Sequence, residues 1–288
     1  MRRLRLFLLF ALTSALVAMP GGGGGSGVVS ARPGDQYVAL GDSFTAGPLI
    51  PAQVAPLGCL KSNRNYPNLV NPTLAGAAFR DISCSGAATR DMFAPQPVTG
   101  GSNPAQLSAL SGSTTVVTIG IGGNDIGFTE IIQNCATLNP FSTPCRDRYT
   151  AGGVDEITRR INDTAPRVGA VLAEIKLRSP IARVFVVGYP QVLPDRGLGC
   201  WPTLPIAYGD VSYLRAKTKE LNSMLRTQAA NAGVAYIDTY APSEGRSACA
   251  SPTRRWVEPL VPANPAAPVH PNGRGMAGVA GIVAAAIQ

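Results

Sequence analysis

The strongest constraint on the fold is an alternation of short β-rich runs with longer segments of helical periodicity. Five runs rich in β-branched and aromatic residues predict strands, at 36–40, 79–83, 114–119, 183–188 and 234–238. Three longer segments, between and after the last three of these runs, predict helices at 154–177, 208–230 and 275–287. Strands that alternate with helices are typical of a parallel sheet covered by crossover helices. The last helix consists mostly of Ala, Val and Gly, and we expect it to be buried.

Four long segments without clear periodicity interrupt this pattern, at 48–65, 134–148, 189–205 and 240–269. Loops of this length in a compact domain are usually functional or stapled, and each contains at least one of the six cysteines. An even number of cysteines in an exported chain indicates disulfides, and six allow 15 pairings. Sequential pairing is the simplest hypothesis, because each bridge would then clip an irregular segment: Cys59–Cys84, Cys135–Cys145 and Cys200–Cys249. The lack of a Cys-x-x-Cys pair argues against a metal site.

The N-terminus has the pattern of an export signal. Three of the first five residues are arginines, residues 6–19 are apolar apart from one Thr-Ser pair, and Val29-Ser30-Ala31 offers a small-residue cleavage site. We therefore predict a signal peptide at 1–31, one domain at 32–288 and a secreted, extracellular protein. The apolar stretch is shorter than the roughly 20 residues of a spanning helix. An uncleaved membrane anchor remains the alternative.

The formal net charge of +8 is spread along the chain, with no basic run interleaved with aromatic residues. Nucleic acid is therefore not an expected partner. Transient attraction to an anionic membrane or cell-wall surface stays open. We expect a monomer.

Ser43 follows the first predicted strand, in Gly41-Asp42-Ser43, and is the candidate nucleophile. A serine hydroxyl needs a base to take its proton. The chain has one histidine, His270, so this residue would have to supply any imidazole base at neutral pH. We expect activity to rise with pH through one group near ~6.5–7. The alternative for Asp42-Ser43 is a plain helix cap.

Gly86 and Asn124 follow the second and third predicted strands. In open α/β sheets ligands bind outside the carboxyl ends of the strands, so Ser43, Gly86 and Asn124 would line one crevice. The N–H groups of Ser43 and Gly86 and the Asn124 amide have the chemistry to hold an oxyanion. An ordinary turn is the alternative for Gly122-Gly123-Asn124-Asp125.

The order Gly-Asp-Ser, Gly, Gly-x-Asn-Asp and a C-terminal His resembles the SGNH hydrolases, also called GDSL esterases and lipases. Arg64-Asn65-Tyr66-Pro67 and the cysteine layout are similar to the secreted actinobacterial branch. The resemblance covers the chain from about residue 37 onward. It implies a flavodoxin-like three-layer αβα domain with a central parallel five-stranded sheet, which hydrolyses carboxylic esters without a cofactor. It also implies the sequential disulfides.

By this resemblance Ser43 is the nucleophile and first oxyanion donor, Gly86 and Asn124 are the other donors, and His270 is the base. The family usually places an acid three residues before the histidine, and Ala267 stands there. Some secreted members use a backbone carbonyl instead, which gives a Ser–His dyad. We predict that the Ala267 carbonyl orients the imidazole, with Glu258 or Asp238 as alternatives.

These features predict a secreted serine esterase or lipase that acts on lipid or short-to-medium acyl esters. Two alternatives remain. One is a non-catalytic cell-envelope binding protein on the same scaffold, which the missing acid would favour. The other is an O-acyl carbohydrate esterase, or an acyltransferase in which another hydroxyl, instead of water, intercepts the acyl-enzyme.

Overall fold

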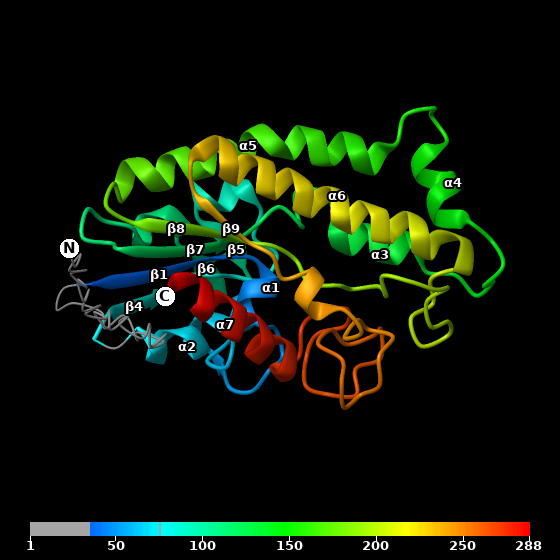
Figure 1. The fold of residues 1–288 in the computed structure, drawn as a ribbon. Coiled ribbons are helices and arrows are strands. Elements are labelled where there is room, and N and C mark those ends of the chain that lie inside the picture. The colour runs from blue at the N-terminus through cyan, green and yellow to red at the C-terminus, as the bar shows by residue number, and fades with distance from the viewer. Residues whose placement is uncertain (1–34, 75) are drawn as a thin grey trace, which may run out of the picture.

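A computed structural model describes residues 35–74 and 76–288, and its centre is a parallel five-stranded sheet (Figure 1). The strand order is β4-β1-β7-β8-β9. The bounds are β4 Ala78–Asp81, β1 Gln36–Gly41, β7 Val116–Gly120, β8 Arg183–Val187 and β9 Ala235–Ile237. With the first strand between the second and the third, this is the flavodoxin-like order. All five predicted strands and the predicted fold class are confirmed. The predicted signal peptide lies outside the described residues.

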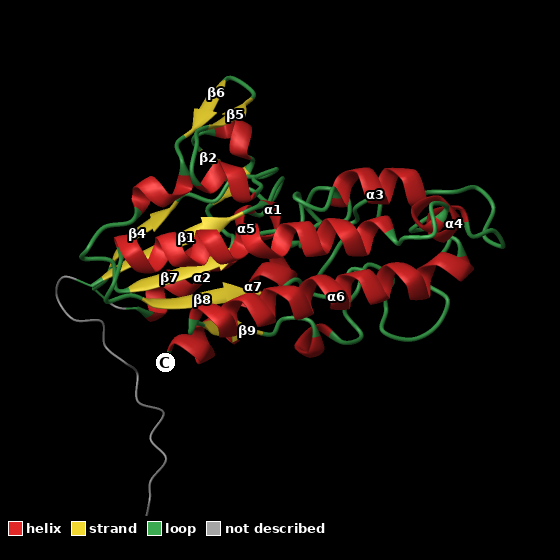
Figure 2. Ribbon diagram, turned by 90° about the horizontal axis from the view of Figure 1, so that it is seen from above, coloured by secondary structure: helices red, strands yellow, loops and turns green. Residues whose placement is uncertain are grey.

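Helices cover both faces of the sheet, which gives three layers (Figures 1 and 2). On one face lie α5 (Glu156–Arg178) and α6 (Tyr208–Ala232), and on the other α2 (Tyr66–Val70) and α7 (Gly273–Ile287). The side chains of β1 alternate between two cores, as the pleat requires. Its odd-numbered residues pack with α2 and α7, and its even-numbered residues pack with α5 and α6. The three predicted helices are confirmed.

The expectation that the last helix is buried was only partly right. Six residues of α7 face the sheet and are buried: Gly275, Met276, Val279, Ala280, Val283 and Ile287. The remaining positions include exposed residues. Ala and Gly occur on both the buried and the exposed face of this helix, because these small residues tolerate solvent. The sequence pattern therefore does not show which face is buried.

Several short elements were not predicted from the sequence. These are helices α1 (Ser43–Ala46), α3 (Phe128–Cys135) and α4 (Pro144–Thr150), and the strand pairs β2 (Gln53–Val54) with β3 (Lys61–Ser62) and β5 (Gln96–Val98) with β6 (Gly101–Asn103). Single 3-10 turns lie at Leu57–Cys59, Asn71–Thr73, Thr89–Met92, Gln106–Ala109 and Ala241–Ser243. Segment 134–148 was therefore wrongly predicted to be wholly irregular. Elements of eight residues or fewer carry too few turns to show a period.

Three disulfides join the cysteines in sequential pairs, as predicted: Cys59–Cys84, Cys135–Cys145 and Cys200–Cys249. The second bridge connects the last residue of α3 to α4. The third connects the loop after β8 to the loop after β9. Among the helices of the described residues, none has the length and apolar character needed to cross a membrane.

Candidate active site

Ser43 is the first residue of α1, directly after β1. Asp42 caps this short helix, and its Oδ1 accepts a hydrogen bond of 2.9 Å from the N–H of Phe44. Gly41 has φ of 154°, and a Cβ at this position would overlap the side chain of Thr45. Asp42 is thus a helix cap, and the tight turn places Ser43 at the carboxyl edge of the sheet, where a nucleophile was expected.

His270 lies in the loop before α7, and its imidazole meets Ser43. The distance from Nε2 to Ser43 Oγ is 2.8 Å. The distance from Nδ1 to the backbone oxygen of Pro268 is 2.7 Å. If Nδ1 carries the proton, Nε2 is the free acceptor that faces the serine hydroxyl.

The prediction that the Ala267 carbonyl orients the imidazole was wrong by one residue. The Ala267 oxygen accepts the backbone N–H of His270 at 3.2 Å, which closes a tight turn. Within this turn Val269 has a left-handed φ of 59°. Such a turn folds the imidazole back onto the carbonyl of Pro268 instead.

Neither alternative acid contacts the imidazole. The Glu258 carboxylate accepts hydrogen bonds from Asn264 and from Asn272 Nδ2, the latter at 2.5 Å. Asp238 accepts the N–H of Tyr240 at 2.8 Å and lies 3.6 Å from the guanidinium of Arg226. The only orienting partner of His270 Nδ1 among the described residues is thus a carbonyl oxygen.

Glu258 instead holds the loop that carries the histidine. Its backbone N–H donates to the His270 carbonyl at 3.0 Å. Its side chain binds Asn272, whose Oδ1 in turn caps α7 by accepting the N–H of Gly275 at 2.9 Å. Although burial opposes ionisation, these hydrogen bonds hold the pKa of Glu258 below its ordinary value.

The predicted oxyanion donors lie at neighbouring strand ends. Asn124 donates from Nδ2 to the Ala87 carbonyl at 2.9 Å, which leaves its second amide hydrogen for a ligand. The N–H groups of Ser43 and Gly86 donate to no other group in the described part of the chain. Asn124 lines one pocket together with Ser43 and a second pocket together with Gly86. Asn124 thus lies between the two pockets, and no single pocket of the described residues holds all three.

Tyr189, which the sequence reading missed, links the nucleophile turn to the loop of Asn124. Its hydroxyl donates to Asp42 Oδ2 at 2.5 Å and accepts the N–H of Gly123 at 2.8 Å. The amide of Asn222 on α6 pairs with both backbone groups of Tyr189, at 2.8 and 2.9 Å. The position of Tyr189 directly after β8 was the available signal, because it lies at the same sheet edge as Ser43 and Asn124.

Burial dominates the electrostatics around this turn. Desolvation raises the pKa of Asp42 to about 7, although the hydrogen bonds from Tyr189 and Phe44 oppose the rise. Burial also lowers the pKa of His270, and the Pro268 carbonyl only partly offsets this effect. His270 is therefore neutral, as a base must be, to a lower pH than an exposed histidine. No cluster of three or more His, Cys, Asp or Glu side chains suited to a metal exists in residues 35–74 and 76–288.

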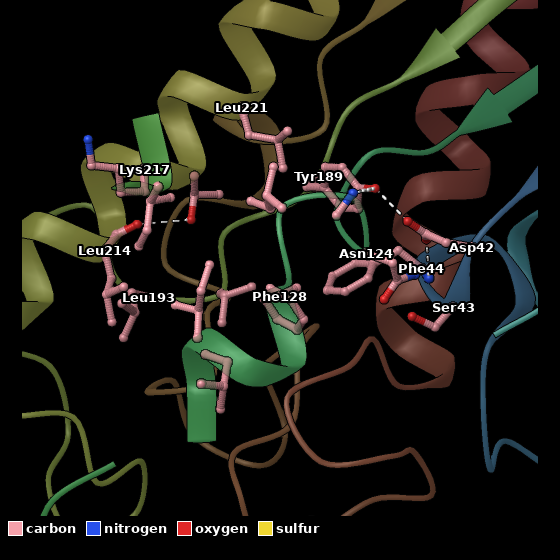
Figure 3. A pocket seen from close by; sticks show the side chains of 17 residues that line it. Asp42, Ser43, Phe44, Asn124, Phe128, Tyr189, Leu193, Leu214, Lys217 and Leu221 are labelled. Atoms are coloured by element: carbon pink, nitrogen blue, oxygen red, sulfur yellow. Dashed lines mark hydrogen bonds between the residues drawn. The ribbon is translucent and has the colours of Figure 1, made fainter. Parts of the chain in front are cut away.

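An apolar slot opens at Ser43 and Asn124 (Figure 3). It encloses about 710 Å³, its open mouth included. Two aromatic rings stand at the mouth: Phe44 lies 5.2 Å from the His270 ring and 5.6 Å from the Phe128 ring, centroid to centroid. Asp42 and Gly123 also line it, and the remaining lining residues come mainly from α3, α6 and the loop after β8: Ile126, Ile131, Ile132, Ile157, Tyr189, Val192, Leu193, Leu214, Lys217, Thr218 and Leu221.

Known proteins are similar to this chain in sequence and in fold. The model of the GDSL-like Lipase/Acylhydrolase family matches residues 39–277. The chain is 40% identical over 252 residues to Lipase 2 of Streptomyces coelicolor, which covers 85% of this chain and 83% of that protein. The structure of an extracellular lipase from Streptomyces rimosus is 26% identical with a TM-score of 0.73, covering 88% of this chain and 99% of the other. Phospholipase A1 from Streptomyces albidoflavus has the same TM-score and coverage at 25% identity. The chain belongs to the GDSL-like Lipase/Acylhydrolase family.

Proposed function

We propose that this protein is a secreted carboxylic ester hydrolase, with Ser43 as nucleophile and His270 as base. The observation that carries the proposal is the 2.8 Å contact between Ser43 Oγ and His270 Nε2, with Nδ1 held by a carbonyl. The family and the lipase and phospholipase relatives support ester substrates, and the apolar slot supports esters of lipid or of short-to-medium acyl chains. The disulfides and the relatives support an extracellular protein with a signal peptide at 1–31 and one catalytic domain at 32–288.

In the first half of the reaction, His270 Nε2 accepts the Ser43 hydroxyl proton as Oγ attacks the ester carbonyl carbon. The N–H groups of Ser43 and Gly86 and the free amide hydrogen of Asn124 stabilise the oxyanion of the tetrahedral intermediate. The intermediate then breaks its bond to the alcohol oxygen, and His270 returns the proton to that oxygen. The alcohol leaves, and the acyl group stays on Ser43.

In the second half, water repeats the attack. His270 takes a proton from the water, whose oxygen adds to the acyl carbon and displaces Ser43 Oγ. The proton passes from His270 to the serine, and the carboxylic acid is released. Pro268 holds the imidazole tautomer throughout, but a neutral carbonyl stabilises the imidazolium less than a carboxylate.

Hydrolysis of p-nitrophenyl esters from acetate to palmitate by oxidised protein tests this proposal. We expect Ser43→Ala and His270→Ala each to lower kcat by at least about a thousandfold, since the two residues act as one unit. Ser251→Ala is the matched control with full activity, because this serine is exposed and its hydroxyl bonds only Thr253 within the described residues. Turnover that survives Ser43→Ala, or no turnover of any ester, would overturn the proposal and favour the non-catalytic binding protein.

Glu258→Gln tests the carbonyl dyad. Because Glu258 binds Asn272 and not the imidazole, we expect a lower melting temperature and a change in kcat/KM of less than about tenfold. A loss of more than about a hundredfold in a folded variant is the scale of losing one catalytic group, and it would contradict the dyad.

A further inference from the structure

The three expected oxyanion donors are held in different ways. A donor must point at the oxyanion to stabilise it, because hydrogen bonds weaken steeply with misalignment. The Ser43 N–H is held by its own helix, since the carbonyl at the other end of the same peptide accepts hydrogen bonds from residues of α1. The Asn124 amide is held by the Ala87 carbonyl at 2.9 Å. The Gly86 N–H lies in a turn, outside any helix or strand, and needs another support.

The turn at Gly86 has two possible forms. The N–H of Ala87 donates to the Cys84 carbonyl at 3.1 Å, which closes the turn. Gly86 has φ of 81° and Ser85 has no positive φ, so the turn is of type II. A type I turn differs by a rotation of about 180° of the central peptide, the one that joins the Ser85 carbonyl to the Gly86 N–H. Glycine adopts either form, so the turn alone does not determine where this N–H points.

The side chain of Gln96 holds one of the two orientations. Gln96 is the first residue of β5, at the base of the β5–β6 hairpin (Figure 2), and it is buried. Its Nε2 donates to the Ser85 carbonyl oxygen at 2.9 Å. The C=O and N–H of a trans peptide point in opposite directions. A donor that holds the Ser85 oxygen on one side therefore directs the Gly86 N–H to the other.

The side toward which this N–H points is free of competing acceptors. The Gly86 N–H donates to no group in residues 35–74 and 76–288, and Gly86 lines a pocket together with Asn124. The hydrogen bond from Gln96 also polarises the peptide, because a carbonyl that accepts a hydrogen bond makes its own N–H a stronger donor. One buried amide thus controls both the direction and the strength of the Gly86 donor.

We propose that Gln96 is a positioning residue of the oxyanion site, which selects the type II turn and aims the Gly86 N–H at the substrate carbonyl oxygen. The inference rests on the proposed ester hydrolysis and names a residue that acts through Gly86. Without the Gln96 donor the central peptide rotates between its two orientations, and one of them lacks the Gly86 donor.

The test removes the donor and keeps the size of the side chain. In Gln96→Met we expect kcat and kcat/KM for the best p-nitrophenyl ester to fall together by about 10- to 100-fold with KM nearly constant. This is the pattern of an interaction made only in the transition state. Gln96→Glu puts an acceptor where the donor stood and should show the same loss. It decides the question if circular dichroism shows that the methionine variant is unfolded.

Asn103→Leu is the matched control. Asn103 pairs with Gln96 across the hairpin and is buried, and its Nδ2 donates to the Ile82 carbonyl at 3.1 Å. Both amides also have an oxygen that lacks a hydrogen-bond partner among the described residues. The two substitutions therefore remove the same kind of hydrogen bond from the same hairpin, and only one of these bonds holds the Gly86 peptide. Asn103→Leu should lose as much stability as Gln96→Met and keep the wild-type kcat.

Inhibition by butylboronic acid gives a second readout, which a purely structural role of Gln96 would not change. The Ser43 oxygen bonds to boron, His270 takes the hydroxyl proton, and a boron-bound oxygen of the tetrahedral adduct occupies the oxyanion site. Transition-state analogues depend on the same contacts as the transition state. We expect the inhibition constant to rise in Gln96→Met by about the factor by which kcat falls, and to stay at the wild-type value in Asn103→Leu.

The outcomes separate this inference from the proposed function. A kcat and an inhibition constant that stay at wild-type values in both Gln96 variants would overturn the positioning role and leave the hydrolase standing. An equal loss of kcat in Gln96→Met and Asn103→Leu also overturns it, because the packing of the hairpin then accounts for the effect. Absence of turnover of every ester by wild type overturns the proposed function itself.

Discussion

At the residue scale, the imidazole of His270 works beside a neutral carbonyl and inside a desolvated site. Of the two features, desolvation favours the neutral ring and the carbonyl favours the charged ring. Burial lowers the pKa of His270, and the Pro268 carbonyl offsets this only in part. This differs from the sequence expectation of a midpoint near ~6.5–7, which assumed an ordinary imidazole.

We therefore predict that kcat/KM rises with pH to a plateau with a midpoint below ~6.5. The sign follows from the mechanism, since only neutral His270 accepts the serine proton and activity is lost as pH falls through its pKa. A series of kcat/KM measurements between pH 4 and 9 checks this. Burial raises the pKa of the Asp42 carboxyl to about 7, so this group could titrate in the same range. The Asp42→Asn variant removes that carboxyl and leaves the titration of His270 alone. A midpoint at or above 7 that persists in this variant would contradict the assignment.

Tyr189 is a positioning residue at the same scale, because its hydroxyl joins Asp42 of the nucleophile turn to Gly123 of the oxyanion loop. Tyr189→Phe leaves both groups buried without that partner, which costs about 1–3 kcal/mol of stability. It also frees the amide of Asn124 to shift, and small misplacements of catalytic groups cost up to about a hundredfold in rate.

For Tyr189→Phe we expect kcat to fall about 10- to 100-fold with KM nearly constant, measured where circular dichroism shows a folded protein. Tyr240→Phe is the matched control, since the Tyr240 hydroxyl bonds Asp195 outside the site. Equal kcat in the two variants would show that the Tyr189 hydroxyl serves stability alone.

At the element scale, α7 places His270 and its glycines fall into two classes. A Cβ at Gly278 would overlap the ring of Trp256, the residue whose backbone also binds Asn272 at the start of the helix. Gly281 faces open space, with nothing within 4 Å of a Cβ. One helix thus offers a packed and an exposed glycine three residues apart.

We predict opposite effects for the same change at these positions. Gly281→Ala should raise the free energy of unfolding by up to about 1 kcal/mol, because alanine is the better helix former. Gly278→Ala should lower it by about 1–3 kcal/mol through overpacking and reduce kcat, as α7 shifts away from Trp256. Urea denaturation of both variants beside wild type is the measurement. Stabilisation by Gly278→Ala would show that α7 does not depend on this contact.

At the scale of the whole molecule, long periodic elements were predictable and short or tertiary features were not. The helices α5, α6 and α7 carry their signals over enough residues to show a period, and the five strands are marked by short runs of β-branched and aromatic residues. The turn residues Ser43 and Asn124 were predictable because strand ends meet at one sheet edge. By contrast, α3 spans only Phe128–Cys135, and its apolar face has meaning only opposite α6.

Two features of the site depend on three-dimensional contacts that no local sequence pattern shows. Pro268 replaces Ala267 as the orienting carbonyl because Val269 adopts a positive φ, which its residue type disfavours. The slot requires α3, α6 and the loop after β8 to meet, so its depth could not be read from spacing. Long-range packing determines both.

The disulfides give the last prediction, because they differ in the length of chain that each one closes. Cys200–Cys249 spans 49 residues and Cys135–Cys145 spans 10. Loop closure gives about 4 kcal/mol for the first and about 3 kcal/mol for the second. The Cys200–Cys249 bridge also joins the loop that carries Val192 and Leu193 of the slot to the loop that carries Trp256.

We expect removal of Cys200–Cys249 by paired Cys→Ala substitutions to lower the urea midpoint and kcat/KM more than removal of Cys135–Cys145. Equal or reversed losses would show that local packing near α3 and α4, and not the length of the closed loop, determines what each bridge contributes.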